Sequence, residues 1–246
     1  MKSEIEYGVF EGDISIMKSI AIITARGGSK RIPRKNIKEF CGKPILLYSI
    51  EAALESKIFD EVMVSTDDQE IAEIALAAGA HVPFMRSADA SNDFATTADV
   101  LKEVLKEYEN RGETFEYLAC LYPTAPFVTA EKLKNAYEVI REENGDWAVP
   151  VVQYGFPPQR AMVIKDKCLK YQYPECRTAR SQDLEPIYHD CGQFYFYKVD
   201  ALLSKDPEEW KVLPLIMKEE ETQDIDNESD WIMAELKYQL MTGGNK

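Results

Sequence analysis

The segment SIAIITARGGSKRIPRKN, residues 19–36, decides the fold of this chain. Its first six residues are small or apolar and mostly β-branched, which is typical of a short buried strand. Two glycines and five basic residues follow directly, at Arg26, Lys30, Arg31, Arg34 and Lys35. In an open α/β sheet, ligands bind outside the carboxyl ends of the strands, so a loop that leaves the first strand lies where a ligand binds.

The rest of the chain alternates between strand-like and helix-like stretches. Strand patterns are expected at 61–68, 81–86, 117–126, 147–154, 193–199 and 212–217. Helical periodicity is expected at 45–56, 69–80, 96–110 and 129–144, and from Asp226 or Asn227 onward. This order predicts an α/β fold of three layers, in which a mostly parallel, twisted sheet is flanked by helices.

Two regions depart from this alternation. Residues 155–192 are rich in proline, arginine and tyrosine, and they predict an insertion within a single domain that spans 17–246. Residues 1–16 lack a clear pattern and are expected to form an N-terminal extension whose removal leaves activity intact.

Composition argues against several classes of protein. The formal net charge is −14, which argues against general nucleic-acid binding. No apolar run approaches the roughly 18–20 residues that span a bilayer, and the N-terminus lacks the apolar region of a secretory signal. The five cysteines show no CxxC spacing, so we expect incidental thiols in a reducing cytoplasm rather than a zinc site or disulfides.

The basic loop can bind a polyphosphate. Gly27 and Gly28 lack side chains, so their backbone N–H groups can approach phosphate oxygens. The surrounding cations can neutralise a triphosphate, and Arg26 can bind it through two hydrogen bonds. The loop matches neither GxxxxGK[ST] nor GxGxxG. A solvated basic turn is the alternative, and the position after a buried strand favours phosphate binding.

Two acidic segments can complement this loop. Asp224 and Asp226 are two residues apart, so in an extended backbone their carboxylates face one side and can bind Mg²⁺, with Mn²⁺ as an alternative. An acidic helix cap is the other interpretation of this pair. The segment 65–68, Ser-Thr-Asp-Asp, ends a predicted strand, and capping of the next helix is favoured there over contact with a ribose or a metal.

Together, these motifs resemble the acylneuraminate cytidylyltransferases, the CMP-sialic acid synthetases, from residue 18 onward. The family pattern ARxxSKxxPxKN occurs at 25–36, and GKPILLYSIEAAL, VMVSTDD, EIAEIALAAGA, LYPTAPFVT and DIDNESDW follow in the family order. RIPRKNIKEFCGKPI, FATTADVL and YHDCGQFY are most similar to the pseudaminic acid branch. The resemblance implies the Rossmann-like fold of the nucleotide-diphospho-sugar transferases.

The resemblance also implies a reaction. CMP would pass from CTP to the anomeric hydroxyl of a nonulosonic sugar, and pyrophosphate would leave. Pseudaminic acid is the expected sugar, because Tyr122 stands where the sialic acid enzymes have a glutamine, and Phe156 and Tyr188 can add apolar surface. The alternatives are N-acetylneuraminic, legionaminic or 3-deoxy-octulosonic acid, and a nucleotide-binding module without catalysis.

Roles for individual residues follow from the same resemblance. The nucleotide-binding set is Arg26, Gly27, Gly28, Ser29, Lys30, Lys35, Asn36, Arg86, Ala95 and Thr97. The sugar-binding set is Tyr122, Gln193 and Arg180, with Arg177 as the alternative arginine. The catalytic set is Arg26, Lys30, Asp224 and Asp226, of which the two aspartates bind Mg²⁺.

Other features stay open at this point. Arg31 and Arg34 have no assigned role, and a lone His189 is more often structural than catalytic. A water bound to Asp224 is one hypothesis for the base that takes the anomeric proton. The family also implies a homodimer that exchanges the segment around 150–180, whereas a lid over the chain's own site is the other interpretation of 155–192.

Overall fold

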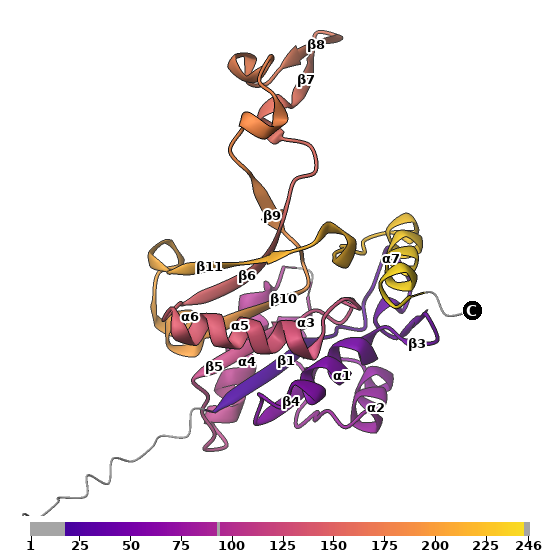
Figure 1. Ribbon diagram of the computed structural model, residues 1–246. Coiled ribbons are helices and arrows are strands. Elements are labelled where there is room, and N and C mark those ends of the chain that lie inside the picture. The colour runs from indigo at the N-terminus through magenta and orange to yellow at the C-terminus, as the bar shows by residue number, and fades with distance from the viewer. Residues whose placement is uncertain (1–17, 93, 244–246) are drawn as a thin grey trace, which may run out of the picture.

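The computed structural model describes residues 18–92 and 94–243, so the N-terminal extension expected over 1–16 lies outside the described residues. The chain forms the three-layer α/β fold expected from the sequence (Figure 1). The strands of the central sheet are β1 (Ser19–Thr24), β4 (Glu61–Ser65), β5 (Tyr117–Leu121), β6 (Trp147–Gln153), β9 (Tyr188–Asp190), β10 (Phe194–Lys198) and β11 (Val212–Met217). The helices are α1 (Leu46–Ser56), α2 (Gln69–Ala77), α3 (Ala88–Ser91), α4 (Thr97–Glu109), α5 (Ala130–Glu142), α6 (Val199–Ser204) and α7 (Glu228–Met241). Two short strands, β2 (Glu39–Phe40) and β3 (Lys43–Pro44), pair before α1.

The sheet is mixed: of the seven strands that the described residues form in it, five run in one direction, as expected for a mostly parallel sheet, and β9 and β10 run in the other. Its order is β11-β6-β10-β5-β1-β4, and β9 also pairs with β6. Strands β9 and β10 run antiparallel to β6, and β10 also runs antiparallel to β5. The β-α-β rhythm did not predict this reversal. It arises because the chain leaves the end of β6 and returns beside it as a hairpin partner, without a crossover helix.

Alternate residues of β1 face opposite layers, so the strand is buried on both sides. Ala21 and Ile23 pack in the cluster with α1, α2 and α5. Ile20 and Ile22 pack in the cluster with α4 and α6. This double burial makes β1 the centre of the core, and it fixes the point at which the basic loop leaves the sheet.

Helices α4, α5 and α7 each begin at a polar residue that accepts a hydrogen bond from the first turn. Thr96 caps α4, Thr129 caps α5 and Asn227 caps α7, each by accepting a backbone N–H, and such a cap contributes about 1 kcal/mol. The sequence allowed either Asp226 or Asn227 as the cap of the last helix. In the structure, the cap is Asn227. The Asp226 side chain is therefore not used as the cap.

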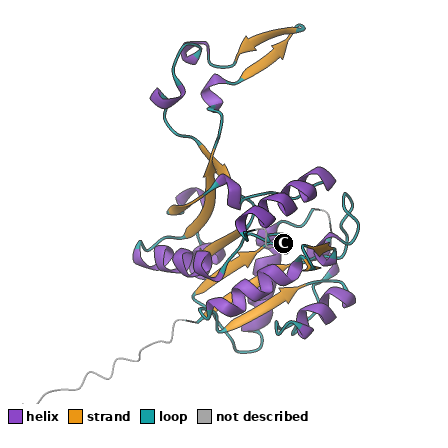
Figure 2. Cartoon of the chain, turned by 45° about the vertical axis from the view of Figure 1, so that its right-hand side comes forward, coloured by secondary structure: helices purple, strands orange, loops and turns teal. Residues whose placement is uncertain are grey.

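Residues between β6 and β9 form an arm that projects away from the sheet (Figures 1 and 2). The arm ends in a hairpin of β7 (Met162–Lys165) and β8 (Cys168–Tyr171). The two turn residues, Asp166 and Lys167, have φ of 53° and 61°, which matches a type I′ turn. This arm occupies the region in which the sequence predicts an insertion.

One strand prediction is wrong. Residues 81–86 form a single bridge, between His81 and Met63, rather than a strand. Pro83 has no N–H to donate, so a ladder cannot continue through it. Among the residues that the structure describes, no helix has both the length and the apolar character needed to cross a membrane.

Candidate functional site

A cleft of about 510 Å³ opens beyond the carboxyl ends of β1, β4 and β5. Ten of the residues predicted to bind ligand or metal line it, namely Arg26, Ser29, Lys30, Lys35, Asn36, Arg86, Ala95, Thr97, Tyr122 and Asp226. The basic loop, the segment before α4 and the end of β5 therefore meet at one place, although they are far apart in the sequence.

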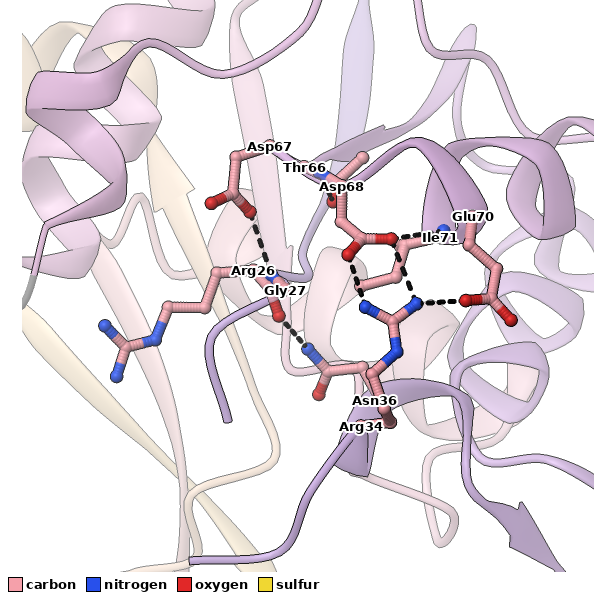
Figure 3. Close-up of polar contacts among 9 residues, drawn as sticks. All are labelled: Arg26, Gly27, Arg34, Asn36, Thr66, Asp67, Asp68, Glu70 and Ile71. Atoms are coloured by element: carbon pink, nitrogen blue, oxygen red, sulfur yellow. Dashed lines mark hydrogen bonds and ion pairs between the residues drawn. The ribbon is translucent and has the colours of Figure 1, made fainter. Parts of the chain in front are cut away.

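The backbone of the basic loop is held by side chains from neighbouring segments (Figure 3). The Gly27 N–H donates to Asp67 Oδ1 at 2.8 Å. The Asn36 side-chain amide donates to the Arg26 carbonyl at 2.8 Å, and Asn36 is only 5% exposed. Asn36 thus positions the loop, and it also lines the cleft, where the sequence predicts that it contacts the nucleotide.

The two glycines of the loop have different environments. A Cβ added to Gly27 would lie 2.7 Å from Asp68 Oδ2 and 2.9 Å from Asp68 Cβ, whereas nothing lies within 4 Å of a Cβ added to Gly28. The structural reason for glycine at position 27 is therefore close packing on Asp68, since its N–H is already bonded to Asp67. Neither glycine lines the cleft.

This difference gives a matched pair of variants. Gly27→Ala is expected to lower the free energy of unfolding by about 1–3 kcal/mol, because the new methyl group overlaps Asp68. Gly28→Ala is the control, and its expected change is within about 0.5 kcal/mol, as for surface substitutions. Urea unfolding of both variants measures the difference. Equal stability of the two would show that the loop moves away from Asp68 without cost.

Asp68 has two further contacts that explain why it cannot move easily. It caps α2 by accepting the Ile71 N–H at 3.0 Å, so the capping role favoured from the sequence is confirmed. It also pairs with Arg34, which bonds Glu70 as well (Figure 3). The hydrogen bond from Arg34 lowers the pKa of Asp68 and raises that of Arg34. Arg34, which had no role in the sequence, is therefore a clamp between the loop and α2.

The acidic pair lies beside Lys35, which the sequence did not suggest. Lys35 Nζ donates to the carbonyl of Ile225 at 2.6 Å, between the two aspartates. Burial lowers the pKa of Lys35, and the charges of Asp226 and Asp224 oppose that effect. Partial burial and repulsion from Asp226 raise the pKa of Asp224. Arg31, also unassigned before, pairs with Asp226 at 2.8 Å.

This arrangement can accept a divalent cation only together with a ligand. In the described ranges, 18–92 and 94–243, no group of three or more His, Cys, Asp or Glu side chains could hold a metal ion. Two carboxylates offer hard oxygen donors, and Mg²⁺ is often bound by one or two carboxylates plus substrate phosphates and waters. The donor set fits such a shared site, although Asp224 itself does not line the cleft.

Arg86 lies at the back of the cleft and is 8% exposed. Its Nε donates to Ser65 Oγ at 2.9 Å and its backbone N–H donates to the Thr66 carbonyl at 2.8 Å. Burial lowers the pKa of its guanidinium group. These bonds orient a buried cation toward the cleft from the end of β4.

Two of the predicted sugar-binding side chains lie outside the cleft. Gln193 is 1% exposed, and its amide nitrogen donates to the Glu221 carbonyl at 2.9 Å. Its backbone carbonyl accepts the Tyr122 N–H, so Gln193 supports Tyr122 instead of lining the cleft. Arg180 lies on the arm and pairs with Asp183 at 2.7 Å. None of residues 155–190, Phe156 and Tyr188 included, lines the cleft of its own chain.

Sequence reasoning missed the residues behind Tyr122. Tyr195 packs its ring edge to face against that of Tyr122, with centroids 5.6 Å apart, and bonds Asp190. The motif YHDCGQFY contains both, but no spacing rule marks an aspartate that reaches the cleft through two tyrosines. Thr96 and Thr124, which also line the cleft, carried no signal beyond their places next to a helix start and a strand end.

A family model and several curated proteins match most of this chain. A family model described as Cytidylyltransferase matches residues 20–199. A pseudaminic acid cytidylyltransferase of Campylobacter jejuni is 43% identical over 191 residues, which cover 77% of this chain and 82% of that protein. A CMP-N,N'-diacetyllegionaminic acid synthase of Legionella pneumophila is 32% identical over 234 residues, which cover 91% of this chain and 97% of that protein.

Two solved structures have a fold similar to that of this chain. A solved CMP:2-keto-3-deoxy-manno-octonic acid synthetase in complex with CTP superposes with a TM-score of 0.66 at 19% identity, covering 93% of this chain and 100% of that chain. A 4-diphosphocytidyl-2C-methyl-D-erythritol synthase from Anaerococcus prevotii gives a TM-score of 0.60 at 16% identity, covering 91% of this chain and 99% of that chain. At these identities the two structures support the fold alone.

Proposed function

Because the chain belongs to the cytidylyltransferase family, we propose that it transfers CMP from CTP to the anomeric hydroxyl of pseudaminic acid and releases pyrophosphate. The observation that carries the proposal is the single cleft in which the basic loop, Arg86 and Tyr122 meet. Two relatives whose names specify pseudaminic acid, at 43% and 42% identity, support the choice of sugar.

We attribute most of the rate enhancement to neutralisation of the phosphate charge and to positioning of the two substrates. Arg26, Lys30 and Lys35 neutralise the triphosphate, and the anomeric oxygen attacks the α-phosphorus in line with the departing pyrophosphate. Lys30 stabilises the negative charge that develops on the α-phosphate and the leaving group. The clamp through Asp67, Asn36 and Arg34 keeps the loop in place, so less reorganisation is needed when CTP binds.

A divalent cation, Mg²⁺ in the first place, is part of the proposal. Asp224 and Asp226 would hold it together with oxygens of CTP. When bound, it would act as a Lewis acid that neutralises phosphate charge. Lys35 and Arg31 keep the two carboxylates near the cleft, by the bond of Lys35 to Ile225 and the pairing of Arg31 with Asp226.

We also propose a homodimer in which the arm of one copy reaches the cleft of the other. Three observations support it: the arm projects from its own body, Arg180 lies outside its own cleft, and Met162, Ile164 and Leu169 of the hairpin are 51%, 75% and 67% exposed (Figure 2). Arg180 would then bind the sugar carboxylate in the partner's cleft.

Mixing two inactive variants tests the exchange. Arg180→Ala and Lys30→Ala are each expected to be nearly inactive, because each removes one half of every composite site. In mixed dimers, one site has both residues intact, so refolding or co-expressing the two is expected to restore up to about a quarter of the activity. No restoration in a mixture that contains heterodimers would favour a site built from one chain.

The deciding experiment is pyrophosphate release with CTP and a panel of sugars. Pseudaminic acid is expected to give the highest kcat/KM, ahead of N-acetylneuraminic, legionaminic and 3-deoxy-octulosonic acids. CTP binding without turnover of any sugar would instead identify a non-catalytic nucleotide-binding module. A cytoplasmic location is part of the proposal, and the five cysteines, none of which forms a disulfide, are consistent with it.

A further inference from the structure

Asp224 and Asp226 lie in an acidic stretch, residues 219–226, that joins β11 to α7. Beyond a short turn at its start, this stretch has no regular secondary structure. Its residues Thr222 and Ile225 are nevertheless only 6% and 1% exposed. A buried irregular backbone needs hydrogen-bond partners from other segments, because its polar groups are cut off from water. The side chains that supply these partners therefore decide where the two carboxylates lie.

Several side chains from other parts of the fold donate to carbonyl groups of the acidic stretch. Gln193 Nε2 donates to the Glu221 carbonyl at 2.9 Å, and Lys237 Nζ donates to the Thr222 carbonyl at 2.8 Å. Together with the bond of Lys35 described above, these contacts come from the basic loop, from the residue before β10 and from α7. The path of the backbone is thus fixed from three sides.

Lys132 holds the same stretch through an ion pair. Its Nζ lies 2.9 Å from Glu221 Oε2, and the two side chains are 15% and 25% exposed. The same Nζ donates to the Phe127 carbonyl at 3.0 Å. The hydrogen bond from Lys132 lowers the pKa of Glu221, so this carboxylate is ionised at neutral pH. The pair therefore ties the turn after β5 to the turn that precedes Asp224.

The place of Lys132 in its own helix shows that the pair serves more than α5. Lys132 is the third residue of α5. The N-terminal end of a helix carries a partial positive charge, so a cation there is disfavoured, and the carboxylate of Glu221 offsets this cost. Phe127 and Ile225, on the two sides of the junction, pack in one apolar cluster. The ion pair thus lies at a packed junction between α5 and the acidic stretch.

We propose that Lys132, acting through Glu221, is a positioning residue for the cation site formed by Asp224 and Asp226. The pair keeps the acidic stretch, and with it the two carboxylates, beside the basic loop, as outer partners of metal ligands do in other sites. This inference rests on the proposed function, which gives the two aspartates their cation. It assigns a role to a lysine that does not line the cleft.

Lys132→Met removes the charge and keeps an unbranched apolar side chain. It is expected to weaken Mn²⁺ binding in the presence of CTP by about tenfold, the lower end of the range for loss of an outer partner of a metal ligand. Turnover should then need correspondingly more Mg²⁺, whereas kcat at saturating Mg²⁺ should stay near the wild-type value. Lys132→Arg should restore most of the affinity, because the charge remains.

Glu221→Gln removes the other half of the pair, and it carries the test alone if Lys132→Met does not fold. Because the two residues act as a unit, the double variant should bind Mn²⁺ no more weakly than either single variant. Lys205→Met is the matched control, since it breaks an ion pair of 2.6 Å with Asp146 and neither residue lines the cleft. This control should lower stability in urea and leave the Mn²⁺ affinity unchanged.

Unchanged Mn²⁺ affinity in Glu221→Gln would overturn the inference, and so would additive losses in the double variant. A loss of affinity as large in Lys205→Met as in Lys132→Met would also overturn it, because it would show a general loosening of the fold. If the wild-type protein turned over none of the sugars, the proposed function would fail. The comparison of Mn²⁺ affinities in the presence of CTP would still decide the role of Lys132, since it needs no turnover.

Discussion

Lys30→Ala is expected to lower kcat for CMP transfer by about 10²–10³-fold, the range observed when one group that stabilises transition-state charge is removed. Lys30 lines the cleft, on the loop that leaves the buried strand β1. In the proposed reaction it meets the charge that grows on the α-phosphate and pyrophosphate, so its loss should affect turnover more than CTP affinity.

Steady-state pyrophosphate release at saturating CTP and sugar measures this effect. Lys134→Ala, which removes a lysine from the exposed side of α5, is the control and should retain full activity. Lys30→Arg should recover part of the loss, because the charge remains but its geometry changes. A change confined to the KM for CTP would mean that Lys30 binds the ground state only.

Asp224→Asn is expected to lower turnover by about 10²-fold or more, because a metal ion that neutralises phosphate charge contributes several kcal/mol to the transition state. Asp226→Asn should have a similar effect and, in addition, release Arg31 from its ion pair. The activity of both variants should depend on Mg²⁺ concentration more steeply than that of the wild type, since one hard oxygen ligand is lost.

The measurement is turnover across a Mg²⁺ titration, together with Mn²⁺ binding in the presence of CTP. Glu228→Gln is the matched control, because this carboxylate pairs with Lys38 and does not line the cleft. Wild-type turnover of Asp224→Asn at saturating Mg²⁺ would remove Asp224 from the metal site. Unchanged Mn²⁺ binding in both variants would argue that the cation is held by CTP alone.

Much of the fold could be predicted because it depends on local patterns. The apolar run of β1, the helical periods of α1, α2, α4 and α5, and the glycine-containing basic loop all act over a few residues. The reversal of β10 could not be predicted in this way, since it depends on where the arm returns, which no local period encodes. A strand was wrongly predicted at 81–86, where only a bridge at His81 forms, because the apolar residues there outweighed the effect of Pro83.

For the candidate site, charge type was easier to predict than the partner of each charge. The sequence marked Lys35 and the two aspartates but not their proximity through the Ile225 carbonyl. Glycine at position 27 suggested approach of a ligand, whereas Asp68 occupies the space that a side chain at this position would need. Arg34 was missed because its partner Asp68 lies 34 residues away in the sequence. Asp190 was missed although its partner Tyr195 lies in the same motif, because no spacing rule marks that pair.

The way in which the arm joins the body has a consequence for how this protein can evolve. Gln153 and Tyr188, where the chain goes out and comes back, are paired neighbours across the β6–β9 ladder. The arm therefore starts and ends at one place on the sheet, and its length is independent of the geometry of the sheet, as in any hairpin loop. Insertions, deletions or exchange of the whole arm can therefore alter the oligomer contacts and the sugar preference proposed above, while the cleft of the body is inherited unchanged.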